Sequence, residues 1–144
     1  MHDAASPIDF DLDLAREKST KNPVYYVQYA HARICSILKK SETTDHGLRT
    51  TNYTLLTTNY ELGLIKQISR LPELVEDIAG NFAVHRLTGY AIDLADNFHK
   101  FYENCRVVGE KEDLMRARIG LITATKIALA NTLSLLGVSA LEKM

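Results

Sequence analysis

The sequence predicts an all-α fold, a bundle of about five to six helices, from three observations. Apolar residues recur at spacings of three and four along most of the chain, and no alternating strand pattern competes with them. Asn22-Pro23, Pro72 and Gly137 stand where helices begin or end. The chain has 144 residues, 46% hydrophobic and 24% charged, a composition typical of one soluble globular domain.

The first predicted helix runs from about Pro23 to Ser41. Asn22 can accept hydrogen bonds from the first free amides, and proline suits the first helical position. Residues 43–58 contain seven threonines and no helical stripe, so they predict a loop. Leucine and isoleucine at three-residue steps then predict a helix up to Pro72, which breaks or restarts it, and a short successor follows.

Two longer helices are predicted in the second half of the chain. Between about Ala83 and Cys105, the core-facing apolar set comprises Leu87, Tyr90, Ala91, Leu94, Phe98, Phe101 and Tyr102. The last helix runs from about Lys111 to Leu136, with acidic residues in its first turn and Gly137 as its C-terminal cap. It carries one charge in its last eighteen residues, so we expect burial on several sides.

Charge and cysteine usage exclude several classes of function. A formal net charge of -1 excludes holding nucleic acid mainly by nonspecific counterion release, so any nucleic-acid contact must be local. Cys35 and Cys105 lack metal-ligand spacing and predict reduced thiols, and no histidine shows metal spacing either. The first residues do not resemble a secretory signal, and residues 119–136 are too polar for a membrane span. We therefore expect a cytoplasmic protein without a metal site.

The helix over 23–41 carries two stripes. One is apolar, as expected for a core-facing helix. On the other, Tyr26, Tyr29 and Arg33 stand at i, i+3 and i+7 on one face. Two rings beside a guanidinium suit an unstacked base, because rings stack on it and arginine bonds its edge or its phosphate. The alternative is an amphipathic rim, with tyrosine hydroxyls in water and the arginine paired with an acid.

No set of residues predicts catalysis. The glycines are isolated rather than grouped in a phosphate-binding loop, and neither cysteine has an obvious activating partner. His31 lies near the apolar stripe, which favours a buried structural histidine.

Residues 22–33, which read NPVYYVQYAHAR, resemble the signature that opens the C-terminal helical domain of arginyl-tRNA synthetases. Asp113-Leu114-Met115-Arg116 looks like the Asp-Ala-Leu-Arg sequence that names this domain, with a different but apolar middle pair. Leu141-Glu142-Lys143-Met144 stands where the family usually ends in Pro-Glu-Arg-Met. The resemblance extends to residues 10–15, 97–103, 117–121 and 135–138.

The resemblance implies that residues 21–144 form a helical anticodon-binding domain of the DALR type. It implies recognition of the anticodon stem-loop of tRNA-Arg, for ATP-dependent aminoacylation by an arginine–tRNA ligase. Residues 1–20 would be a junction from a catalytic domain that these residues do not contain. The implied anticodon-binding residues are Tyr26, Tyr29, Arg33, Tyr102 and Met144, with Gln28 and His31 as further candidates.

Neither the HIGH-type nor the KMSK-type signature of class I synthetases occurs in these residues. We therefore expect no catalytic residue and no cofactor here, with ATP and Mg²⁺ serving the full-length enzyme. The expected partners are tRNA-Arg and the catalytic domain of the same synthetase, and neither DNA nor a membrane. Two alternatives from other classes are a free-standing helical module that binds a protein or RNA, and a small hydrolase using His31 and Cys35.

Overall fold

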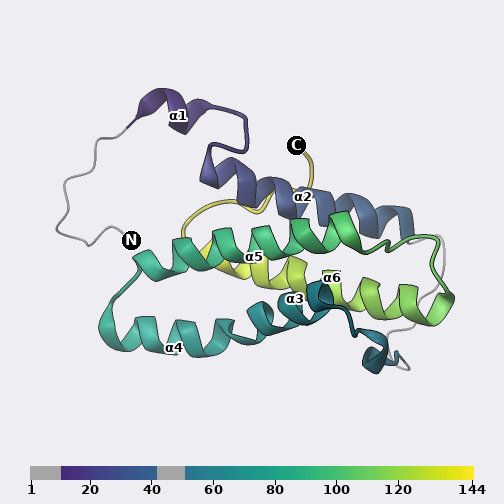
Figure 1. Cartoon of the computed structure of the whole chain (residues 1–144). Helices are drawn as coiled ribbons and strands as arrows, with labels where there is room; N and C mark the ends of the chain where they lie inside the picture. The colour runs from purple at the N-terminus through teal and green to yellow at the C-terminus, as the bar shows by residue number, and fades with distance from the viewer. Residues whose placement is uncertain (1–10, 42–50) are drawn as a thin grey trace.

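A computed structural model describes residues 11–41 and 51–144. Within these ranges the chain is all-α and contains no strand, which confirms the predicted fold class (Figure 1). The described elements are α1 (Leu12–Arg16), α2 (Pro23–Ser41), the 3₁₀ helix η2 (Tyr53–Leu55), α3 (Asn59–Ser69), α4 (Leu71–Asn81), α5 (His85–Asn104) and α6 (Glu112–Leu135).

Helix α5 is central to the bundle. It packs against α2, α3, α4 and α6, and α6 also packs against α2 and α3 (Figure 1). The predicted apolar stripe of α5 faces the core, where Leu94, Phe98 and Phe101 are fully buried. Tyr102 departs from that prediction, since 38% of its surface is exposed beside α2.

Asn22 begins α2 as predicted. Its side-chain oxygen accepts hydrogen bonds from the amides of Val24 and Tyr25, at 3.1 and 3.4 Å. Its Nδ2 donates to the carbonyls of Ala15 and Glu17, at 3.1 and 3.0 Å. One side chain therefore caps α2 and holds the chain next to α1. Helix α1 itself was not predicted; it has five residues, none of them buried.

The threonine-rich segment is only partly a loop. Residues 43–50 of the predicted loop lie outside the described residues, but the remainder includes η2, which corrects the prediction. Asn52 caps η2, and the Tyr53 ring lies against Gly120 of α6. A Cβ at Gly120 would stand 2.6 Å from the Tyr53 hydroxyl oxygen, so this packing requires glycine.

The later helix boundaries follow local chain chemistry. Pro72 lies in the first turn of α4, as its predicted role of breaking or restarting a helix requires. Phe82, with φ of 56°, ends α4, so α5 starts at His85, slightly later than predicted. Gly137 ends α6 as predicted: its φ is 73°, and the next amide, of Val138, donates to the Leu133 carbonyl at 2.8 Å.

A buried ion pair joins α3 to α6. Glu61 accepts a hydrogen bond from Nε of Arg118 at 2.7 Å, and both side chains are at least nine-tenths buried. Arg118 also donates to the carbonyl of Arg106 at 2.6 Å, while the amide of Thr58 donates to Glu61 at 2.9 Å. Burial alone would raise the pKa of Glu61, but the Thr58 and Arg118 hydrogen bonds outweigh it and lower that pKa.

Both cysteines are free and buried. Within residues 11–41 and 51–144, no helix is long and apolar enough to cross a membrane. In the same ranges, no group of three histidine, cysteine or acidic side chains is arranged to hold a metal ion.

Candidate nucleic-acid interface

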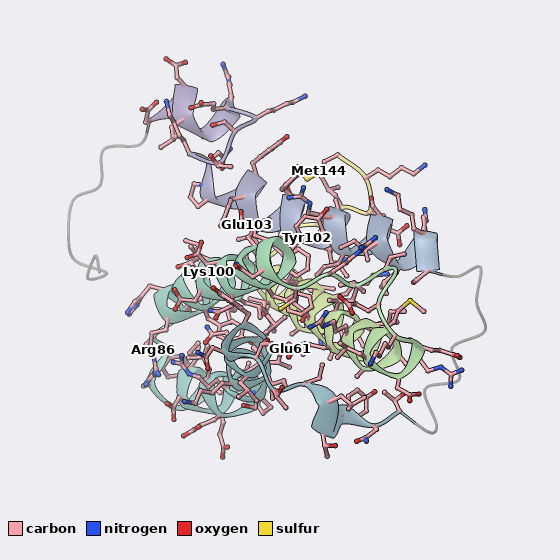
Figure 2. The ribbon with its side chains drawn as sticks, turned by 45° about the vertical axis from the view of Figure 1, so that its right-hand side comes forward. Glu61, Arg86, Lys100, Tyr102, Glu103 and Met144 are labelled. Atoms are coloured by element: carbon pink, nitrogen blue, oxygen red, sulfur yellow. The ribbon has the colours of Figure 1, made fainter. Side chains whose placement is uncertain are left out.

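A cavity of about 490 Å³ opens beside α2. Four of the seven predicted site residues line it: Tyr29 and Arg33 from α2, Tyr102 from α5, and Met144 from the C-terminal tail, which we define as residues 138–144. Figure 2 shows Tyr102 and Met144 in the same part of the molecule, away from Arg86. The remaining lining residues are Ala32, Ser36, Ile37, Lys40 and Lys143.

Arg33 is held by aromatic rings. Its guanidinium carbon lies 4.1 Å from the centre of the Tyr102 ring and 5.3 Å from that of Tyr29, both within cation–π range. No carboxylate of the described residues lies within ion-pair distance of Arg33. The amphipathic-rim alternative predicts that Arg33 pairs with an acidic residue. Arg33 instead lies near two aromatic rings, and its hydrogen-bond donors remain available.

Tyr29 belongs to a row of rings at the edge of this cavity. Its ring stacks with that of Tyr25 at 6.4 Å between centres and with that of His99 at 6.0 Å. The neighbouring rings restrict the orientation of the half-buried Tyr29, which also lines the cavity.

Tyr26 is engaged within the domain rather than in the cavity lining. Its hydroxyl donates to Asp96 at 2.7 Å, and its ring contacts His99 at 4.8 Å between centres. Burial and the Asp96 carboxylate both raise the pKa of Tyr26. The Tyr26 hydrogen bond in turn lowers the pKa of Asp96 against the effect of burial, with help from Lys100 at 3.3 Å.

His99 connects the two tyrosines of the predicted stripe, a role that the sequence reasoning missed. Its ring contacts both Tyr26 and Tyr29. Burial lowers the pKa of His99, and the nearby Arg33 cation lowers it further against Asp96 and Glu103. The signal available in the sequence was its i, i+3 spacing from Tyr102 on one helix face.

Gln28 and His31 make their described polar contacts with the tail. Nε2 of Gln28 donates to the carbonyl of Ser139 at 2.8 Å, and Nδ1 of His31 lies 2.8 Å from the carbonyl of Leu141. His31 is buried, as the apolar stripe predicts. Because a carbonyl only accepts, Nδ1 carries the hydrogen and cannot take a proton from the Cys35 thiol, 3.8 Å away. This geometry argues against the hydrolase alternative.

The charge around the cavity is local and positive. Its three charged lining residues are Arg33, Lys40 and Lys143, in a chain whose formal net charge is -1. A second cavity of about 460 Å³ shares Ile37, Lys40 and Tyr102 with the first, and its other charged lining residues are Glu103 and Arg106. Aromatic faces beside cations suit an unstacked nucleotide and its phosphate.

Residues 27–144 match the model of the DALR anticodon-binding domain. The chain belongs to this family. The DALR domain match includes α2 from Val27 onward, the later helices and the tail, so it covers every residue that lines the cavity.

Similar proteins are arginine–tRNA ligases. The one from Moorella thermoacetica is 51% identical, and the one from Dehalococcoides mccartyi is 48% identical; each alignment covers 96% of this chain and 25% of the relative. The arginyl-tRNA synthetase of Thermus thermophilus superposes with a TM-score of 0.72 and 34% identity, over 83% of this chain and 21% of that chain. This DALR domain therefore spans about a quarter of the length of the curated relatives it matches.

Proposed function

We propose that this chain binds the anticodon stem-loop of tRNA-Arg as the anticodon-binding domain of an arginine–tRNA ligase. The observation that carries the proposal is Arg33, whose guanidinium lies within cation–π distance of both the Tyr29 and the Tyr102 ring without a carboxylate partner in the described residues. Tyr29 offers a face for stacking, Arg33 offers planar donors, and Met144 offers an apolar wall. Lys40 and Lys143 supply the local charge for the phosphates.

The donor pattern of Arg33 suits one base in particular. All arginine codons share a central guanine, so the anticodons of tRNA-Arg share a central cytosine. Cytosine presents two adjacent acceptors, N3 and O2, on its pairing edge, and a guanidinium can donate to both. Uracil carries a hydrogen on N3 and would oppose one of these donors. We infer that Arg33 favours a central cytosine over uracil.

In the whole ligase, ATP, Mg²⁺ and arginine would be handled by a catalytic domain, in the cytoplasm. Residues 21–144 would bind the tRNA, and residues 1–20 would lead from the catalytic domain. The capping of α2 by Asn22, whose side chain also bonds two carbonyls of the preceding segment, supports this arrangement. On this proposal, the 144-residue chain supports no arginine-dependent ATP–pyrophosphate exchange, and detection of that exchange would contradict it.

Fluorescence titration of the 144-residue chain with tRNA-Arg and a noncognate tRNA, at several salt concentrations, tests the proposal. We expect tighter binding of tRNA-Arg at every salt concentration, because base contacts persist where charge attraction is screened. A tRNA-Arg transcript with uracil at the central anticodon position should lose this advantage. Equal binding of cognate and noncognate tRNA would instead favour the free-standing module.

A further inference from the structure

The C-terminal tail reaches the cavity although it carries no helix of its own. Gly137 turns the chain at the end of α6, and the tail runs back beside α2 (Figure 1). Val138 and Ala140 are partly buried against the core. The tail ends at Met144, which is 48% exposed and lines the cavity with Lys143. Contacts outside α6 must therefore hold Lys143 and Met144 at the cavity.

The two α2 side chains at i and i+3 bond to alternate carbonyls of the tail. Gln28 donates to Ser139 and His31 to Leu141, both at 2.8 Å. Side chains at i and i+3 of a helix are about 5–6 Å apart, and alternate residues of an extended segment are about 6–7 Å apart. The spacing on the helix thus matches the spacing along the tail, with Val138 and Ala140 left to pack inward.

We propose that Gln28 and His31 are positioning residues: they clamp the tail onto α2 so that Met144 forms a wall of the base-binding cavity. This inference rests on the proposed function and deepens it, because it assigns the two residues to the tail rather than to the RNA. The clamp fits the order of residues along α2. Gln28 and His31 hold the tail before it reaches Ala32 and Ser36, which line the same cavity as Met144.

A double-mutant cycle separates a clamp from a direct RNA contact. The variant Gln28→Ala is compared with wild type in the full chain and in a chain shortened by residues 143–144, which keeps both bonded peptide carbonyls but removes Met144. We expect Gln28→Ala to weaken tRNA-Arg binding by roughly three- to tenfold in the full chain, the scale of one hydrogen bond. In the shortened chain the same substitution should change affinity by less than about twofold.

Equal losses in the two backgrounds would overturn the clamp, because Gln28 would then act on the RNA without the tail. No loss in the full chain would also overturn it. Asn131→Ala, on the exposed face of α6, is the matched control and should leave binding unchanged. For His31, Asn places an amide donor near the position of Nδ1, so His31→Asn should bind more tightly than His31→Ala. If both fold and bind equally, His31 has no part in the clamp.

A measurement without RNA keeps the clamp distinguishable from the proposed function. The chain is labelled with methyl-¹³C methionine, and Met115, which packs against the core, is the internal control. Gln28→Ala should move the Met144 methyl resonance toward its position in urea and leave Met115 unchanged. An unmoved Met144 resonance would overturn the clamp. A moved resonance in a protein that fails to prefer tRNA-Arg would retain the clamp and refute the function.

Discussion

Two arginines in this domain have opposite surroundings. Arg118 is buried between α3 and α6, and its donors are taken by Glu61 and by the Arg106 carbonyl. Arg33 lies beside an open cavity over two tyrosine rings, and no carboxylate of the described residues pairs with it. The difference contrasts structural pairing with the proposed recognition: the paired Arg118 joins two helices, whereas Arg33, held by ring faces, has donors that we propose serve the tRNA.

The largest effect should come from breaking the buried pair. Glu61→Ala leaves the buried Arg118 charge with only the more distant Glu110 carboxylate, 3.7 Å away, so we expect the free energy of unfolding to fall by about 3 kcal/mol. Chemical denaturation measures this loss. The exposed pair of Arg86 and Asp77, 3.4 Å apart, supplies the control. Asp77→Ala should cost at most about 1 kcal/mol. Similar losses for the two variants would contradict the assignment of a structural role to Glu61.

The second prediction concerns the stacking face at the cavity. Tyr29→Ala should weaken tRNA-Arg binding by about 1–3 kcal/mol, the usual scale of one base–aromatic stack. Titration by fluorescence or calorimetry measures the change, with circular dichroism to verify folding. Tyr60→Ala, at an exposed tyrosine of α3 outside the cavity, should leave affinity unchanged. Unchanged affinity in a folded Tyr29→Ala chain would show that this face of α2 is only a structural rim.

The third prediction tests whether Arg33 acts through its planar fork or only through its charge. Arg33→Lys keeps the charge and loses one of two parallel donors, so preference for a central cytosine over uracil should fall by about 1 kcal/mol. Binding to both tRNA-Arg forms is compared at fixed salt. Arg86→Lys, which Figure 2 shows far from Met144, is the control. If Arg33→Lys retained the full preference, charge alone would explain the contact.

The pH dependence of the free energy of unfolding gives a further test of the buried pair of Glu61 and Arg118. The pKa of Glu61 is below its ordinary value of 4.5 in the folded chain, so its stabilising contribution is complete above pH 4.5. The contribution is lost as pH falls through the lowered pKa. Denaturation of Glu61→Gln should therefore show a weaker decline in stability below pH 4.5 than wild type. An identical decline would place the acid sensitivity in other carboxylates.

The sequence predicted those features that depend on neighbours along the chain. The caps at Asn22 and Gly137 and the stripe of Tyr29 and Arg33 arise from spacing within one helix, so periodicity reveals them. The pairing of Glu61 with Arg118 joins residues 57 positions apart and leaves no local pattern. The bonds to the tail were equally inaccessible, because a backbone carbonyl has no side-chain signature. The placement of Tyr102 and Met144 beside α2 was implied by family resemblance alone.

The smallest predicted effect links Arg33 to the rings beside it. Burial and the Arg33 cation both lower the pKa of His99, while Asp96 and Glu103 act in the opposite direction. Removing the cation leaves the burial in place. Arg33→Gln should therefore raise the His99 midpoint in an NMR titration without bringing it to the ordinary value of 6.5. The remote Arg86→Gln should leave the midpoint unchanged. A midpoint that did not rise in Arg33→Gln would mean that the guanidinium does not act on the ring row, and the cavity would then lose its electrostatic connection to His99.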